Sequence, residues 1–99
     1  MSVRWSPHAL DRVVEIAGYI AQDSPQAAED WVDRIFDAVE QLGAFPRSGK
    51  PGRDIEPSDA REFVFESYRV FYDVIDDDAE VLTVRRCSEQ IDPGELERD

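Results

Sequence analysis

Four arginines are concentrated in the segment 61–87, REFVFESYRVFYDVIDDDAEVLTVRRC, and they are the residues of this chain best suited to bind an anion. Arginine offers a planar fork of donors that contacts a carboxylate or a phosphate through two bonds at once. Because it stays protonated, acid–base chemistry would have to come from Glu62 or Tyr72, and Tyr72 is expected to pack. We therefore assign no catalytic residue. The candidates for binding a target or a partner are Arg61, Arg69, Tyr72, Arg85 and Arg86.

The segment that carries these arginines also has the composition of a small sheet. It holds three runs rich in Val, Ile, Phe, Tyr and Thr, which are typical of β-strands. The runs cover residues 61–65, 68–75 and 81–86. Glu66-Ser67 leaves room only for a tight hairpin, and residues 76–80 form an acidic turn, so consecutive strands are expected to pair antiparallel. Because side chains alternate along a strand, Arg85 and Arg86 are predicted to point to opposite faces.

Two amphipathic helices are predicted before the sheet. The first begins with Ser6 as N-cap and Pro7 at the first helical position, followed by apolar residues every three or four positions. Ser24 and Pro25 open the second helix in the same way, and its apolar stripe continues to Leu42. Since only a few residues separate the helices, we expect an antiparallel helical hairpin whose stripes pack on the sheet, with no cofactor site.

The resulting order of elements predicts an α+β fold. An N-terminal strand at residues 2–5, expected beside one of the later strands, precedes the two-helix hairpin and the three-strand antiparallel meander (β-α-α-β-β-β). We assign residues 1–87 to a single domain and residues 88–99 to an acidic C-terminal tail. Ile91 and Leu96 are the only large apolar residues of this tail, so we expect at most a light contact with the domain.

Charge limits the partners that this chain can bind. It carries 23 acidic against 11 basic residues, a net charge of −12, and such a surface repels nucleic acids, so the chain alone is not expected to bind them. Residues 45–59, rich in proline and glycine, are predicted to be a loop between the helices and the sheet. Three cations in this loop are further candidates for contact with a phosphate or a partner: Arg47, Lys50 and Arg53.

Several classes of protein are excluded by simple counts. The single cysteine rules out an intrachain disulfide, and no cluster of Cys and His indicates a metal site. No apolar run approaches the roughly 18 residues that span a bilayer, and the start lacks the apolar region of a signal peptide. We therefore expect a cytoplasmic protein without a metal, a cofactor or a membrane partner.

The ordered set of these features resembles the ParE/RelE toxin superfamily of type II toxin–antitoxin systems, and most of all its ParE branch. The similarity extends over about the first 86 residues, and no single piece of it is specific. It rests on Trp5-Ser6-Pro7 with Ala9 and Asp11, Tyr19-Ile20, Ser24-Pro25 with Ala28, Phe45-Pro46 with Gly49, Arg61-Glu62, Tyr68-Arg69-Val70 with Tyr72, and Val81-Leu82. The fold that the resemblance implies, two helices against an antiparallel sheet, agrees with the pattern of elements above.

The resemblance also implies a function. RelE-like members cleave messenger RNA on the ribosome, whereas ParE-like members poison DNA gyrase, and both are neutralised by a cognate antitoxin. Cleavage by 2′-hydroxyl attack needs a base, an acid and cations. The only histidine, His8, lies far along the chain from the sheet, and Cys87-Ser88-Glu89 follows the last strand in place of a Tyr or His-Tyr. We therefore favour a ParE-like protein-binding toxin with DNA gyrase as the implied target. The alternatives are a RelE-like ribosome-dependent endoribonuclease and a non-toxic family member that only binds its antitoxin.

Two expectations about surfaces follow. A small sheet with helices on one face leaves apolar surface on the other, so we expect the antitoxin to wrap the hairpin and the open face, adding a helix in a groove or a strand at an edge. We also expect at least one of the four sheet arginines to lie at the functional surface. The competing interpretation is that they neutralise acids on neighbouring strands. These acids are Glu62, Glu66, Asp73 and Glu80.

Overall fold

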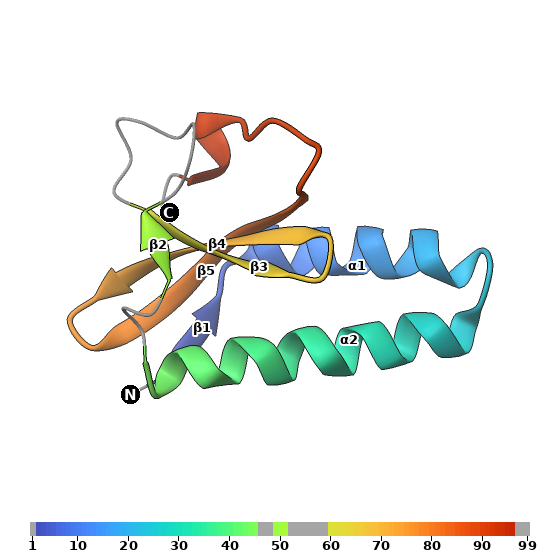
Figure 1. Ribbon diagram of the computed structural model, residues 1–99, viewed down its shortest axis with the longest axis horizontal. Coiled ribbons are helices and arrows are strands. Elements are labelled where there is room, and N and C mark those ends of the chain that lie inside the picture. Colours follow the sequence, from blue (N-terminus) through green and yellow to red (C-terminus); the bar gives the residue numbers. More distant parts are fainter. Residues whose placement is uncertain (1, 46–48, 52–59, 97–99) are drawn as a thin grey trace.

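The computed structural model describes residues 2–45, 49–51 and 60–96, in which two long helices pack on one face of a five-stranded sheet (Figure 1). The predicted α+β class is confirmed. In chain order the elements are β1 (Val3–Trp5), α1 (Pro7–Ala21), α2 (Pro25–Glu40), the 3-10 turn η1 (Gln41–Gly43), β2 (Lys50–Pro51), β3 (Arg61–Phe65), β4 (Tyr68–Ile75), β5 (Asp78–Arg86) and the 3-10 turn η2 (Pro93–Leu96).

Both helices start at the Ser-Pro pairs that the sequence indicated. The Ser6 hydroxyl accepts a hydrogen bond of 3.0 Å from the Ala9 N–H, and Ser24 accepts one of 3.1 Å from the Ala27 N–H. Each cap satisfies an N–H that the helix itself leaves without a partner. The helices form the predicted antiparallel hairpin, and its connected end projects beyond the sheet (Figure 1).

The three predicted strands form the antiparallel meander. β3 and β4 have the predicted bounds, and their hairpin turns through Glu66-Ser67, with Glu66 in the left-handed region at a φ of 55°. β5 begins at Asp78 rather than at Val81, because the acidic turn is shorter than expected. Only Asp76 and Asp77 form the turn, and the residues after them already pair with β4.

The specific strand pairings at the two edges of the sheet were not predicted from the sequence. β1 runs parallel to β5, with Trp5 opposite Val81, and the Ser6 hydroxyl then donates to the Leu82 carbonyl at 3.1 Å. At the opposite edge, β2 pairs with the start of β3, with Lys50 opposite Glu62. The predicted loop therefore contains a short strand, and the sheet order is β1-β5-β4-β3-β2.

The main core lies between the helices and the inner face of the sheet. Trp31 is 2% exposed, and its ring stands edge-on to Tyr68, with the ring centroids 5.2 Å apart. The other fully or nearly fully buried side chains of this core are Ala9, Val13, Ile16, Ile35, Val39, Leu42, Val70, Tyr72, Ala79, Val81 and Val84. Most residues of the apolar stripes predicted for the two helices are thus core, as expected, whereas Leu10, at the side of the first stripe, is 41% exposed.

Part of the outer face of the sheet is covered by the tail, which corrects the expectation of a light contact. Ile91 and Leu96 are 7% and 6% exposed and pack in a second cluster with Ala60, Phe71 and Leu82. Burial of a side chain of this size contributes about 1.5–3 kcal/mol. The tail, as far as Leu96, is therefore an integral part of the fold, and it covers the outer face of the sheet around Phe71 and Leu82.

Candidate functional site

Arg69, a predicted candidate, lies buried on the outer face of β4. Its Nε donates to Oε2 of Glu62 at 2.6 Å, and the two side chains are only 4% and 7% exposed. The guanidinium also lies 4.6 Å from the ring centroid of Phe71. This charge-assisted bond joins β3 to β4, so a partner could bind Arg69 only by separating a buried pair of opposite charges.

Arg85, on the same outer face, is held by the tail. Its Nε donates to Oε2 of Glu95 at 2.9 Å, its Nη2 contacts the other oxygen of that carboxylate, and its Nη1 donates to Glu89 at 3.2 Å. Two residues of α1 extend the network, since His8 lies 3.4 Å from Glu95 and Arg12 lies 3.9 Å from Glu89. The tail carboxylates of Glu89 and Glu95 thus bind the cationic side chains at this end of the sheet.

This network lowers the pKa of Glu89. Burial alone would raise it, but the Arg86 backbone N–H and the positive charges of Arg85 and Arg12 together outweigh that effect. The carboxylate is therefore charged near neutral pH, where it contributes to the attachment of the tail. The sequence did not suggest Arg12, whose Nε also donates to the Val84 carbonyl at 2.9 Å. Its place in the first turns of a helix gave no sign of this role.

Arg86 points to the helix side and Arg85 to the outer face, so the two side chains take the predicted opposite directions. Arg86 is exposed, and its guanidinium lies 4.9 Å from the ring centroid of Tyr19 on α1, which is itself 59% exposed. A cation over an exposed aromatic ring presents both charge and apolar surface to a partner. Of the four sheet arginines, this one has the most accessible setting among the described residues.

Arg61 and Tyr72 converge on one residue of the chain. The Tyr72 hydroxyl accepts a 2.8 Å hydrogen bond from the Gly49 N–H, and Arg61 donates to the Gly49 carbonyl at 2.8 Å. Tyr72 is fully buried, and its pKa is raised by burial, which the bond from Gly49 and the charge of Arg61 only partly oppose. The phenol is therefore neutral at physiological pH, and the two side chains anchor the chain where it enters β2.

The predicted loop cations fall in different parts of the structure. Lys50 lies in β2 and is exposed. Arg47 and Arg53 lie outside the described residues. The structure thus distributes the predicted candidates over both faces and one edge of the sheet. Among the described residues, no group of three or more His, Cys, Asp or Glu side chains could hold a metal ion, and no helix is long and apolar enough to cross a membrane.

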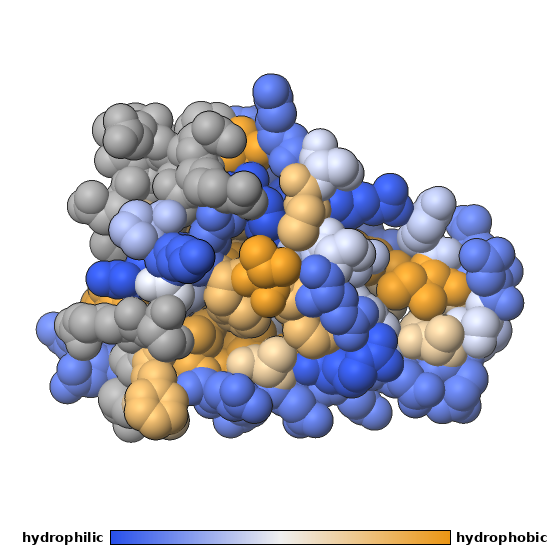
Figure 2. All heavy atoms as spheres, in the orientation of Figure 1, coloured by the Kyte–Doolittle hydropathy of each residue, from blue (hydrophilic) through white to orange (hydrophobic). Residues whose placement is uncertain are grey.

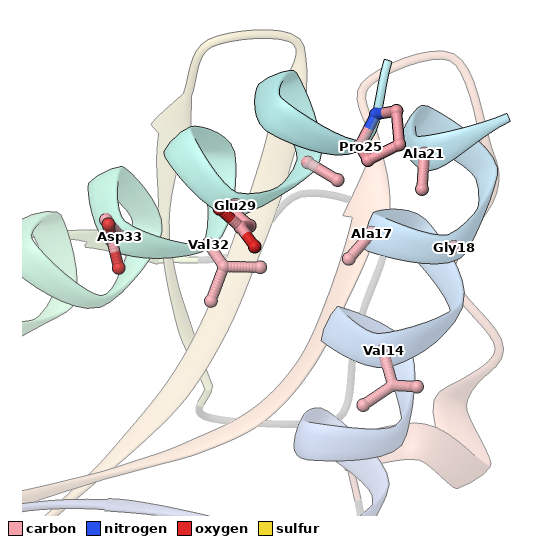
Figure 3. Close-up of a pocket in the computed structure, with 9 residues that line it drawn as sticks. Val14, Ala17, Gly18, Ala21, Pro25, Glu29, Val32 and Asp33 are labelled. Atoms are coloured by element: carbon pink, nitrogen blue, oxygen red, sulfur yellow. The ribbon is translucent and has the colours of Figure 1, made fainter. Parts of the chain in front are cut away.

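A groove between α1 and α2 is a surface feature that was not located from the sequence. It has a volume of about 620 Å³ and lies near the connected end of the hairpin. Figure 3 shows Ala17 of α1 and Val32 of α2 reaching into the space between the helices, and Figure 2 shows hydrophobic side chains between the helices on the face in view. Its lining residues are Val14, Ala17, Gly18, Ala21, Pro25, Ala28, Glu29, Val32 and Asp33.

The groove is apolar and unfilled in this chain. Val14 is 69% exposed although it is a large aliphatic residue, and a Cβ added at Gly18 would meet no atom within 4 Å. The signal was present in the sequence as a second stripe, offset by one residue from the buried stripe of α1. Exposed apolar surface between two helices is the kind of site that receives an amphipathic helix.

Comparison with known proteins gives three findings. The family model described as "ParE toxin of type II toxin-antitoxin system, parDE" matches residues 3–91. A protein of Sinorhizobium fredii (strain NBRC 101917 / NGR234), named "Putative toxin Y4kP", is 41% identical over 94 residues, which span 89% of this chain and 90% of that protein. A solved structure, "Chromosomal ParDE TA system from P. aeruginosa", superposes with a TM-score of 0.73 at 23% identity, over 87% of this chain and 95% of that chain. The last likeness establishes a shared fold.

Proposed function

Because the chain belongs to the ParE toxin family of type II toxin–antitoxin systems, we propose that it inhibits growth by binding a protein target such as DNA gyrase, and that a cognate antitoxin neutralises it. It acts in the cytoplasm, where that target is found. Besides family membership, the main observation in support of this proposal is that two of the sheet arginines, Arg69 and Arg85, are bound by carboxylates of the same chain.

The paired arginines favour contact with proteins over cleavage of RNA. Glu62 holds Arg69 in a buried bond, and Glu95 and Glu89 hold Arg85 through both ends of its guanidinium. A phosphate could reach either arginine only by displacing a carboxylate, at a cost that is large for the buried pair. This supports a toxin that binds its target through other parts of its surface.

Arg86 and Tyr19 form the surface that we assign to the target. They lie together on the helix side at the end of β5, and both are exposed. Arginine and tyrosine are enriched among the residues that contribute most to binding at protein interfaces. The proposed contact is therefore centred on this pair.

The antitoxin is assigned to a different surface. Helices cover the inner face of the sheet and the tail covers part of the outer face, whereas the groove between α1 and α2 is an apolar surface that remains exposed. An antitoxin helix in this groove would leave Arg86 and Tyr19 uncovered or only partly covered. Neutralisation would then depend on the bulk of the bound antitoxin near the target or on a change in the hairpin.

Induced expression tests the proposal. We expect growth arrest with filamentation and a DNA-damage response, relieved by co-expression of the product of the neighbouring reading frame, and loss of supercoiling by purified gyrase mixed with the chain. Arg86→Gln should lose inhibition while keeping its melting temperature. Arg4→Gln, at another exposed arginine, is the matched control and should remain toxic.

Other outcomes would overturn it. Rapid arrest of translation with cleaved messenger RNA and unaffected gyrase would identify a ribosome-dependent endoribonuclease instead. A folded chain that has no effect on growth would refute toxicity. Equal loss of inhibition in Arg86→Gln and Arg4→Gln would remove the assignment of the target surface, while the proposed activity would stand.

A further inference from the structure

The groove between α1 and α2 has an apolar floor and an acidic rim. Val14, Ala17 and Val32 supply aliphatic surface, and the exposed carboxylates of Glu29 and Asp33 stand along the side of α2. The lining of α1, from residue 14 to residue 21, spans about two helical turns or about 10 Å. The shape therefore suits a short helix with apolar residues on one stripe, and the rim sets the charge beside that stripe.

The acidic character extends over the whole hairpin. Residues 7–40 contain eight carboxylates and two arginines, which gives a charge of −6 with His8 neutral. Both arginines are already engaged, since Arg12 donates to the Val84 carbonyl at 2.9 Å and to Glu15 at 2.7 Å, and Arg34 donates to Glu66 at 2.8 Å. The field around the groove is therefore negative, and it adds to the net charge of −12 of the chain.

We infer that the occupant of this groove is a basic amphipathic helix: the neutralising segment of the antitoxin, with an apolar stripe of about two turns flanked by Lys or Arg that face Glu29 and Asp33. This inference rests on the proposed function, and it names the chemistry of the partner at the groove. A neutral segment with the same apolar stripe would lack the attraction to Glu29 and Asp33. An acidic segment would be repelled by these carboxylates.

Two other occupants are disfavoured by the same charges. A second copy of this chain would bring a surface of the same sign, at −12 per copy, against the rim. The tail of the chain itself, up to Leu96, packs on the outer face of the sheet beside Phe71 and Leu82. The negative field would also speed the encounter with a basic partner and would make that encounter sensitive to salt.

Two synthetic helical peptides test the inference directly. They have equal length and an identical apolar stripe at positions i, i+3, i+4 and i+7, and the flanking positions carry Lys in one peptide and Glu in the other. Binding to the full chain is measured by fluorescence anisotropy. The Lys peptide should bind at least about tenfold more tightly at about 0.01 M salt, and the ratio should fall toward one near 1 M salt, where the Debye length is only about 3 Å.

Charge reversal at the rim supplies the matched variants. Glu29→Lys combined with Asp33→Lys should invert the preference between the peptides. Asp30→Lys combined with Asp37→Lys changes the net charge equally on the same helix at exposed residues that do not line the groove, and it should keep the preference for Lys. Gly18→Leu, which fills the groove without meeting another atom at its Cβ, should weaken both peptides.

The outcomes divide cleanly. The inference is supported if the preference between the two peptides is inverted in Glu29→Lys with Asp33→Lys and kept in Asp30→Lys with Asp37→Lys. Equal shifts in both double variants, no preference between the peptides, or no binding by either peptide overturns it. The proposed function fails separately, when the chain does not inhibit growth. If the chain inhibits growth and the neighbouring product rescues the rim variant as well as the control, only the charge inference is lost.

Discussion

Replacing Arg69 by methionine tests whether the buried pair with Glu62 is structural. Methionine keeps an unbranched apolar side chain at this position, but it removes the guanidinium that lies 4.6 Å from the Phe71 ring centroid. It also leaves a carboxylate that is 7% exposed without the Arg69 donor 2.6 Å away. Removing one member of a buried ion pair costs about 3–5 kcal/mol. A domain of this size has a total stability of about 5–15 kcal/mol, so the loss is a large fraction of it.

The matched variant replaces both partners. Arg69→Met with Glu62→Leu removes both charges, and exchange of a buried pair for apolar residues of similar volume is often neutral or stabilising. We therefore expect the single variant to lose about 3 kcal/mol and at least about 12 °C of melting temperature. The double variant should recover most of that loss. Growth inhibition should follow stability in both.

Urea unfolding followed by the fluorescence of Trp5 and Trp31 provides the measurement, with equal m-values as the check that one transition is compared. A single variant that loses less than about 1 kcal/mol would refute the reasoning, since removing one member of a buried ion pair costs more than that. A double variant as unstable as the single one would refute it as well. If the Arg69→Met chain is stable but no longer inhibits growth, Arg69 has a functional rather than a structural role.

Three further changes have definite expected results. Gly18→Ala should raise the free energy of unfolding by about 0.5–1 kcal/mol, because the added methyl meets no atom and alanine favours a helix; a lower melting temperature would contradict this. Gly49→Ala should destabilise by about 1–3 kcal/mol, because its Cβ would lie 2.1 Å from the hydroxyl of the fully buried Tyr72, and Tyr72→Phe in the same background should restore part of the loss in urea titrations. Since the pKa of Glu89 lies below its ordinary 4.5 in the folded chain, its contribution is complete above that value and is lost as the pH falls through the folded pKa. The protection of residues 87–96 against hydrogen exchange, taken relative to the intrinsic exchange rate at each pH, should therefore fall in acid, and Glu89→Gln should show less pH dependence. A protection factor in that segment that is as high at pH 3 as at pH 7 would count against the network.

Local signals predicted the elements well. The Ser-Pro pairs set the starts of both helices, and the bounds of β3 and β4 follow from runs of β-branched and aromatic residues. The start of β5 was placed too late because Asp78 and Glu80 have a composition typical of turns, whereas pairing with both β4 and β1 brings them into the strand. Tertiary pairing here overrides local propensity.

The candidate site depended on information that a single sequence does not carry. Whether Arg69 faces solvent or Glu62 is decided by the register between β3 and β4, and the contact of Arg85 with Glu95 requires the tail to return over the sheet. Ile91 and Leu96 looked too few to attach a tail, because their partners on the outer face could be identified only once the sheet had formed. The opposite directions of Arg85 and Arg86 could be predicted, since they follow from strand geometry alone.

The pairing of β1 with β5 determines when the nascent chain can fold. Ser2 and Ser6 bond to Asp78 and Leu82, contacts that join residues 76 positions apart, and the apolar stripes of α1 and α2 have no sheet to cover them until β4 and β5 exist. At about 5–20 residues per second, a ribosome needs roughly 2–9 s to advance from the end of α2 to the end of β5. During that interval the emerging hairpin exposes its core face to chaperones and to any antitoxin already present. A ribosome that stalls before β5 would release an unfolded fragment rather than a folded toxin, so translation itself delays the appearance of the folded protein.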